Sequence, residues 1–381
     1  MRAADTRTGR CALNLAFRLL KQPLIRRSEI RRWKSGIEAG KDTARVYYGF
    51  ENVPSAGEHA SGGIVKCQDL QRMFPNDPVA PNMLYLVSSA LPPHAPLLAR
   101  LCRRRGGKVV LNQNGVAYPG WYGSGWETVN RPMKDIHSLA DHVFYQSGFC
   151  QRSAYKFLGR RAGPSEILYN PVDTSLFDPR RTPYCSSALV LLLAGSHEFR
   201  YRVTTAVDVL AAIHEKLDGA RLLIAGRYGW LPDERASLED LRDYAHSRGV
   251  LDSVDIAGAY TQKEAPDLYR RADLLLHTKY NDPCPRVVVE AMASGLPVVY
   301  SASGGVPEQV GSDGGIGLEA TQSWYHDCPP NSDQLCRAVL RVLENYERFS
   351  AAARKRAVER FALEPWLERH AEVFETLVRT P

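Results

Sequence analysis

The sequence has no long apolar run, no paired-cysteine motif and no repeat. Its longest apolar stretch, ALVLLLA at 188–194, has seven residues, whereas a helix that crosses a bilayer needs roughly 20. The eight cysteines include no C-x-x-C pair and no His/Cys cluster with zinc spacing, which speaks against a structural metal and favours unpaired, mostly buried thiols in a reducing cytoplasm. What remains is an ordinary globular chain of 381 residues, long enough for two domains.

Positive charge is concentrated at the N-terminus. Residues 1–34 hold ten Lys or Arg against Asp5 and Glu29, a net +8, so the rest of this +7 chain sums to about −1. A neutral body does not indicate a nucleic-acid-binding protein. Apolar residues recur at helical spacing over 13–24, which fits a helix on an anionic membrane surface and equally a helix docked on the body. We expect a basic arm at 1–44 and a cytoplasmic protein, peripheral on the inner membrane face if the arm binds lipid; no signal peptide is indicated.

Strands and helices alternate along the rest of the chain, which predicts an α/β protein with parallel sheets covered by helices on both faces. The proline-rich stretch 171–187 shows no periodicity and is the best domain boundary. We predict a Rossmann-like domain at 45–175, a second one at 176–358, and a C-terminal helix at 359–381 that crosses back to the first, with Pro365 at a helix break. The two domains would face each other across a cleft at the carboxyl ends of their strands. A kinase, an epimerase or a periplasmic binding protein also fits this architecture.

The segment NDPCPRVVVEAMASG, residues 281–295, carries the most chemical information. Asp282 can cap a helix, the two following prolines suit its first turn, and Gly295 suits its end, so the pattern predicts a helix over 283–294. On that helix Asp282 and Glu290 would lie about 12 Å apart along the axis. This separation matches the reach from a sugar, across a diphosphate, to a nucleoside ribose. Carboxylates suit the hydroxyls at both ends, and the helix N-terminus suits the diphosphate between them.

The same segment resembles the E-x7-E region of the family 4 retaining glycosyltransferases, which have the GT-B fold. Further matches follow in the family's order over about 46–375: YNPVDTSLFDP, LLLAGSHEFRYRV, LLIAGRYG, LYRRADLLLHTKYND, GLPVVYSASGGVPEQVG and GGIGLE. The resemblance implies transfer of a glycosyl group from a nucleoside-diphosphate sugar to an acceptor hydroxyl with retention of configuration. It also implies that the sugar nucleotide is a co-substrate and that no cofactor is needed. No D-x-D sequence occurs, so no metal ligand is predicted.

The resemblance assigns roles to individual residues. Glu290 would bind the ribose hydroxyls, and Asp282 would be the catalytic residue at the donor sugar near the anomeric centre. Arg286, beside the first helical turn, would meet a phosphate. Glycines and one serine would form the loops that approach the donor: Ser303, Gly304 and Gly305 in the second domain, Gly62 and Gly63 in the first.

The departures from the family pattern also make predictions. Ser196 and Tyr201 stand where the family has Arg and Lys, so we expect Arg200 or Arg202 to supply positive charge to the diphosphate. In the first domain LNQNG stands where many members carry a His, which makes Gln113 and Asn114 hydroxyl-binding residues on the acceptor side. Trp121, in the aromatic stretch 117–127, would either stack on an acceptor sugar or pack within its own loop.

The sequence also allows other roles for these residues and other functions for the protein. Asp282 could be a helix cap only, Glu290 a solvated helix residue, and the arginines surface charges. A sugar-nucleotide 2-epimerase would act on the nucleotide sugar without an acceptor, although the E-x7-E-like spacing argues against it. A non-catalytic scaffold of polysaccharide assembly would bind nucleotide without turnover. For the transferase, the predicted partners are a nucleotide-sugar donor and a saccharide or lipid-linked acceptor of bacterial surface polysaccharide or glycolipid synthesis.

Overall fold

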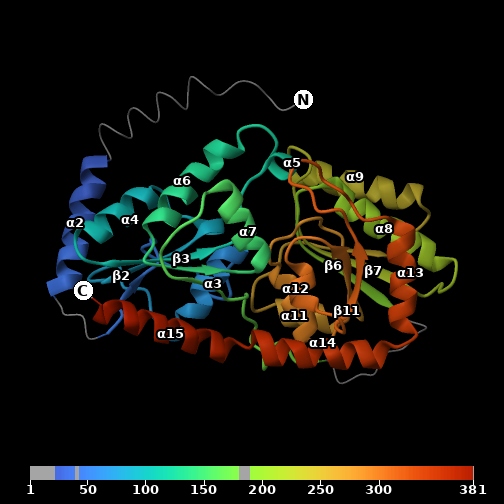
Figure 1. Cartoon of the computed structure of the whole chain (residues 1–381). Helices are drawn as coiled ribbons and strands as arrows, with labels where there is room; N and C mark the ends of the chain where they lie inside the picture. Colours follow the sequence, from blue (N-terminus) through green and yellow to red (C-terminus); the bar gives the residue numbers. More distant parts are fainter. Residues whose placement is uncertain (1–21, 39–42, 180–188, 381) are drawn as a thin grey trace.

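The computed structural model describes residues 22–38, 43–179 and 189–380, which form two parallel sheets with helices on both faces (Figure 1). The first sheet has five strands in the order β1-β2-β3-β4-β5, and all of its neighbouring pairs are parallel. Its strands are β1 (Val46–Tyr47), β2 (Met83–Val87), β3 (Lys108–Gln113), β4 (His142–Tyr145) and β5 (Ser165–Ile167).

Two helical layers cover this first sheet, because successive side chains of a strand point to opposite faces. Leu84 and Leu86 face one layer, whereas Met83 and Tyr85 face the other. The first layer consists of α2 (Gln22–Glu38), α4 (Ala95–Arg104), α6 (Trp126–Leu139) and α7 (Gly148–Phe157). The second layer consists of α3 (Gly62–Leu70) and α15 (Leu363–Arg379). A short helix, α5 (Pro119–Tyr122), lies between β3 and α6.

The second sheet has six strands in the order β11-β10-β9-β6-β7-β8, again with parallel neighbours. Its central strands are buried on both faces and read as almost continuous apolar runs, as expected for a covered parallel sheet. The strands are β6 (Val190–His197), β7 (Arg221–Tyr228), β8 (Val254–Ala257), β9 (Leu274–His277), β10 (Val298–Ala302) and β11 (Gly315–Glu319).

Helices also pack on both faces of the second sheet. Leu191 and Leu193 face one layer, which consists of α8 (Arg200–His214), α9 (Glu234–Ser247) and α13 (Ser332–Leu343). Leu192 and Ala194 face the other layer, which consists of α10 (Ala265–Arg270), α11 (Arg286–Ala293), α12 (Val306–Val310) and α14 (Tyr346–Phe361). The predicted α/β class and the two facing sheets are therefore confirmed. The domain limit at 175/176 stays a prediction, and part of the expected linker, 180–188, lies outside the described residues.

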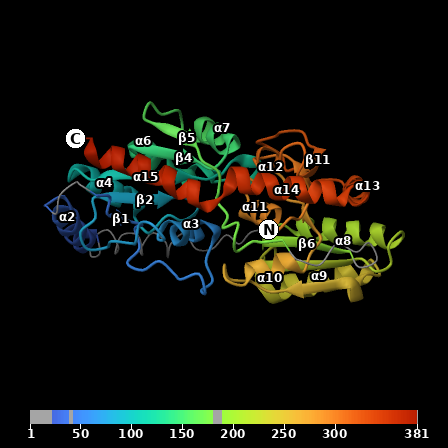
Figure 2. The same cartoon turned by 90° about the horizontal axis from the view of Figure 1, so that it is seen from below.

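The last two helices connect the domains. Seen from below, α14 and α15 lie in line along one side of the molecule (Figure 2). The break between them is at Ala362 (φ −56°, ψ 143°), and Pro365 lies in the first turn of α15 rather than at the break itself. Leu363, Trp366 and Phe374 of α15 pack into the core of the first domain, so the predicted return of the C-terminal helix is confirmed. At the break, Ala362 forms an isolated parallel bridge with Val172, whose N–H donates to Phe361 O at 2.7 Å.

The described part of the basic arm is docked on the body of the protein. Trp33 of α2 is fully buried, and its indole N–H donates to Glu29 at 3.0 Å. The Arg32 guanidinium lies 4.2 Å from the centre of the Tyr47 ring. Residues 13–21 of the expected apolar pattern lie outside the described residues. Within the described part of the chain, no helix has the length and apolar character that a membrane span requires.

The cysteines follow the expectation where the structure describes them. Cys67, Cys102, Cys150, Cys284 and Cys336 are buried and unpaired, and Cys328 is unpaired and partly exposed. Cys11 and Cys185 lie outside the described residues.

Candidate active site

A cleft of about 870 Å³ opens between the two domains. Its walls are the segments that leave the carboxyl ends of the strands: Asn114 follows β3, Ser196 lies near the end of β6, and His277 ends β9. Parallel sheets bind ligands at this edge. Of the predicted residues, eight line the cleft: Asp282, Glu290, Arg286, Arg202, Gly62, Gly63, Asn114 and Trp121.

The helix that carries this site begins later than predicted. α11 starts at Arg286 rather than at 283, with Pro285 as its N-cap (φ −68°, ψ 125°). Asp282 and Cys284 each precede a proline, and the proline ring disfavours the helical conformation of the residue before it. Asp282 is therefore not the helix cap but lies in a loop before the helix. The N-terminus of α11 still meets the cleft, which Arg286 and Val287 line.

The Ser303–Gly305 loop supports Asp282 from behind and is not among the residues that line the cleft. Gly305 N–H donates to Asp282 O at 2.9 Å, and Asn281 N–H donates to the Ser303 hydroxyl at 2.8 Å. Gly304 has φ +68°, and a Cβ at Gly305 would lie 1.9 Å from Pro283 O. Both positions need glycine because the two loops touch backbone to backbone.

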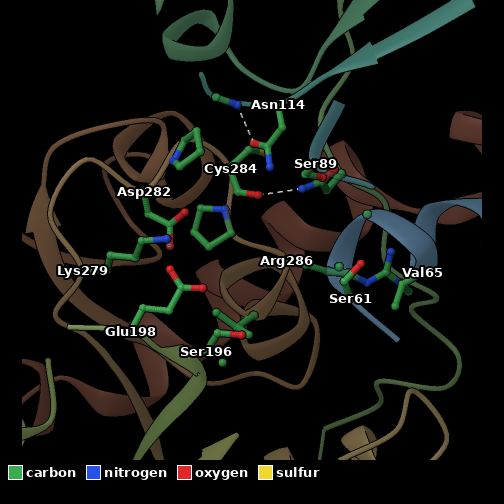
Figure 3. Close-up of a pocket in the computed structure, with 18 of the residues that line it drawn as sticks. Ser61, Val65, Ser89, Asn114, Ser196, Glu198, Lys279, Asp282, Cys284 and Arg286 are labelled. Atoms are coloured by element: carbon green, nitrogen blue, oxygen red, sulfur yellow. Dashed lines mark hydrogen bonds and ion pairs between the residues drawn. The ribbon is translucent and has the colours of Figure 1, made fainter. Parts of the chain in front are cut away.

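The Asp282 carboxylate lies beside a lysine and a histidine of the cleft, and burial lowers the pKa of that histidine, His277. Its Oδ2 is 3.4 Å from Lys279 Nζ and 3.3 Å from His277 Nε2, the second contact being within ion-pair distance but outside hydrogen-bond geometry. Burial alone would raise the pKa of Asp282, but Lys279, His277 and Arg202 together hold it below its usual range. Asp282 therefore stays ionised. Figure 3 shows Asp282, Lys279 and Glu198 gathered on one side of the cleft.

Glu290 occupies a different environment. Its Oε1 accepts from Arg286 Nε at 2.8 Å, and its Oε2 accepts from the Tyr269 hydroxyl at 2.8 Å. Burial raises the pKa of Glu290 despite the neighbouring Arg286. Gln262 Nε2 also donates to Oε1, at 3.5 Å. A carboxylate has about four lone-pair positions, so Glu290 keeps acceptor capacity for one further hydroxyl.

One ion pair joins the two domains at this point. Arg286 Nη1 lies 2.5 Å from Asp69 Oδ2 of α3, and both side chains are buried. Arg286 is therefore held between a carboxylate of each domain, Asp69 and Glu290 (Figure 3 shows it beside Ser61 and Val65 of the α3 segment). No motif in the sequence marks Asp69, because its partner lies 217 positions away.

The two arginines expected at the diphosphate are separated by the structure. Arg200 does not line the cleft: its guanidinium makes two hydrogen bonds to Asp240 of α9, at 2.7 and 3.0 Å, on the outside of the domain. The prediction that Arg200 contacts the diphosphate is therefore wrong, because this bidentate pair holds its guanidinium outside the cleft. Arg202 is buried and lines the cleft; its terminal nitrogens donate to Ser196 O and Ala194 O, while its Nε has no partner.

Of the residues predicted on the acceptor side, Asn114 and Trp121 line the cleft and Gln113 does not. Gln113 is fully buried and donates to Asn114 O at 2.7 Å, so it stands behind the cleft wall, whereas Asn114 lines it. Trp121 lines the cleft with 38% of its surface exposed. Beside it, Tyr118 packs edge-on against Trp324 of the second domain, with ring centres 5.0 Å apart. This aromatic contact between domains has no signal in the sequence.

Gly62 and Gly63 form the first turn of α3 at the cleft, after Ser61 as N-cap. One turn further, Lys66 also lines the cleft and is only 2% exposed. Neither Lys66 nor Lys279 of the cleft was predicted from the sequence, although the position of Lys279 three residues before Asp282 is a signal for it. Within the described ranges, no three His, Cys, Asp or Glu side chains are grouped to hold a metal ion.

Comparisons with known proteins agree with this arrangement. The family model "Glycosyl transferases group 1" matches residues 185–357. The chain is 35% identical over 130 residues to D-inositol 3-phosphate glycosyltransferase of Mycobacteroides abscessus, covering 33% of this chain and 28% of that protein. It is 29% identical over 242 residues to the GDP-mannose-dependent alpha-(1-6)-phosphatidylinositol monomannoside mannosyltransferase of Mycobacterium tuberculosis, covering 56% and 57%.

The chain thus spans less than two thirds of these curated relatives. In three dimensions it resembles HepE of Anabaena, solved in complex with UDP-glucose, with a TM-score of 0.62 at 20% identity over 78% of this chain and 79% of that one. Residues 185–357 are therefore similar to the group 1 glycosyltransferase model, and the two facing domains have the GT-B fold.

Proposed function

We propose that this protein transfers a glycosyl group from a nucleoside-diphosphate sugar to an acceptor hydroxyl, with retention of configuration and without a metal ion. The observation that carries the proposal is the placement of Asp282 and Glu290 in one cleft, on either side of the N-terminus of α11. Glu290 would bind the ribose hydroxyls, and the diphosphate would lie against the helix N-terminus, where free amides and the helix dipole favour an anion.

Asp282 would act at the donor sugar. Its low pKa keeps the carboxylate charged, and a fixed negative charge stabilises the positive, oxocarbenium-like ring of the transition state. Arg202 would stabilise the negative charge that develops on the leaving diphosphate. The retaining course rests on the sequence resemblance, and the attack would come from the face that the diphosphate leaves.

The acceptor would bind on the first-domain side, at Asn114 and Trp121. The named relatives act on an inositol phosphate and on a phosphatidylinositol mannoside, which supports a polar, lipid-linked or saccharide acceptor in surface polysaccharide or glycolipid synthesis. For such an acceptor, the basic residues 1–34 would hold the protein on the cytoplasmic face of an anionic membrane. Deletion of residues 1–21, which keeps α2 and its buried Trp33, tests this arm: liposome binding should be lost.

The test of the proposed function is a panel of UDP-, GDP- and ADP-sugars. Binding of the true donor should raise the melting temperature of the protein. With that donor, nucleoside diphosphate should be released in the presence of acceptor, and the product should carry the anomeric configuration of the donor. Acceptor-independent conversion of the sugar would instead identify an epimerase, and binding without turnover under all conditions would identify a scaffold.

A further inference from the structure

Lys66 is a buried cation that the proposed function does not use. It lies on α3, it is 2% exposed, and its Nζ donates to Gly62 O at 3.1 Å. No carboxylate of the described residues forms an ion pair with it. Transferring an ammonium group out of water is costly unless an anion compensates it. A lysine so placed at a ligand cleft therefore favours an anionic ligand.

The neighbours of Lys66 leave its charge uncompensated. Asp69, three residues further along α3, is engaged by Arg286, and Arg286 also holds Glu290. The Cys284 thiol faces Lys66 from the second domain, but burial raises its pKa to about 12, so it is neutral. Because Arg286 forms ion pairs with both Asp69 and Glu290, it is poorly placed to bind a phosphate.

The place of Lys66 fits a phosphate. It lies one turn after the N-terminus of α3, whose cap residue Ser61 makes no side-chain cap bond, and this end of the helix lines the cleft. A Cβ at Gly62 would meet nothing within 4 Å, so the approach to the backbone is open. Across the cleft, the second-domain wall carries Ser196, Arg202, Arg227 and Lys279, whereas Arg200 faces Asp240 outside the cleft.

We propose that Lys66 binds the donor diphosphate from the first domain; this inference rests on the proposed function. Lys66 and Arg202 would then hold the diphosphate from opposite walls. Closure of the cleft on the donor would bring the lysine and the phosphate oxygens together.

The experiment measures binding of nucleosides and nucleoside diphosphates by calorimetry on the full chain, using uridine with UDP, guanosine with GDP and adenosine with ADP. Lys66→Met should lower the affinity for the nucleoside diphosphate that the wild type binds by about 10- to 100-fold, because a charge-assisted hydrogen bond is lost. Nucleoside binding should be unchanged. Lys66→Arg should recover most of the loss, and Lys134→Met, which removes an exposed charge of α6 outside the cleft, should have no effect.

The outcomes separate this proposal from the proposed function. If the wild type binds no nucleoside diphosphate, the function itself is wrong. If the wild type binds one and Lys66→Met binds it equally well, Lys66 has no role at the diphosphate. If Lys66→Met weakens nucleoside and diphosphate alike, or Lys66→Arg rescues nothing, the lysine is only structural.

Binding as a function of pH gives a second readout. Burial and the neighbouring Arg286 lower the pKa of Lys66 to about 8, with Cys284, Cys67 and Asp69 as the other ionisable groups around it. The diphosphate binds the charged form, so wild-type affinity should fall as pH rises through 8, and Lys66→Met should lack this fall. An identical pH profile in both proteins would contradict the proposal.

Discussion

Asp282 and Glu290 are buried in the same cleft, yet their pKa values move in opposite directions. Asp282 shares its surroundings with Lys279, His277 and Arg202, and these groups together outweigh the effect of burial. Glu290 has one cationic partner, Arg286, which it shares with Asp69 of the other domain, and burial prevails. The difference teaches that burial alone does not set the charge of a carboxylate; the number of cations and the number of acids that share them decide it.

Replacing the carboxylate in the cation-rich environment should have the largest effect. Asp282→Asn keeps the shape but removes the charge proposed to face the donor sugar, so turnover should fall about 100-fold or more, equivalent to about 3 kcal/mol of transition-state stabilisation. Release of nucleoside diphosphate in the presence of acceptor measures it. Nucleotide affinity should change little, and full turnover in Asp282→Asn would remove this residue from the mechanism.

Removing the other carboxylate should weaken binding instead of chemistry. Glu290→Ala loses the proposed acceptor of the ribose hydroxyls and leaves Arg286 with Asp69 alone, so affinity for the nucleoside should fall about 10-fold or more. Calorimetry with the nucleoside measures this, and Glu127→Ala, at an exposed position of α6, serves as control. Unchanged affinity would mean that the ribose lies elsewhere.

Breaking the link between the domains should have a smaller effect. Asp69→Asn removes the charge that fixes Arg286 from the first domain. The Glu290 side chain is then positioned less precisely but keeps its hydrogen bond with Arg286. We expect donor KM to rise about 3- to 10-fold with kcat nearly constant, because a positioning group is disturbed rather than a reacting one. Asp135→Asn, which removes an exposed ion pair with Arg100, is the matched control. A fall in kcat alone would place Asp69 at the chemistry.

The smallest effect should appear on acidification. The pKa of Glu290 is raised, so protonation should begin to weaken nucleoside binding above the ordinary glutamate range, while Asp282 remains charged. Affinity measured between pH 4.5 and 7 should fall by a few-fold at the acid end, and Glu290→Gln should remove that dependence. A wild-type profile that is flat over this range would contradict the raised pKa.

Much of the second domain could be predicted from the sequence because its strands are continuous apolar runs. The longest apolar run of the sequence, 188–194, overlaps β6, and β7 and β9 are also apolar along most of their length. The start of α11 could not be placed as well, because the helix-capping pattern and the effect of proline on its preceding residue oppose each other at 282–285.

Contacts across the cleft were beyond prediction. Lys66 and Asp69 belong to an ordinary amphipathic segment, and their significance depends on Arg286 of the other domain. The pairing of Arg200 with Asp240 likewise depends on how α8 packs against α9. A sequence motif locates residues that act together along the chain; it does not show which charges a distant element has already neutralised.

The bridge between Val172 and Ala362 limits how the protein can move. The chain passes from the first domain to the second near residue 172 and returns at 362, and these two passages are joined by a hydrogen bond. Rotation of one domain about this point would leave both passages almost unstretched, whereas sliding of one domain past the other would break the bond. Substrate entry and product release should therefore follow a hinge rotation of the two domains about this bridge.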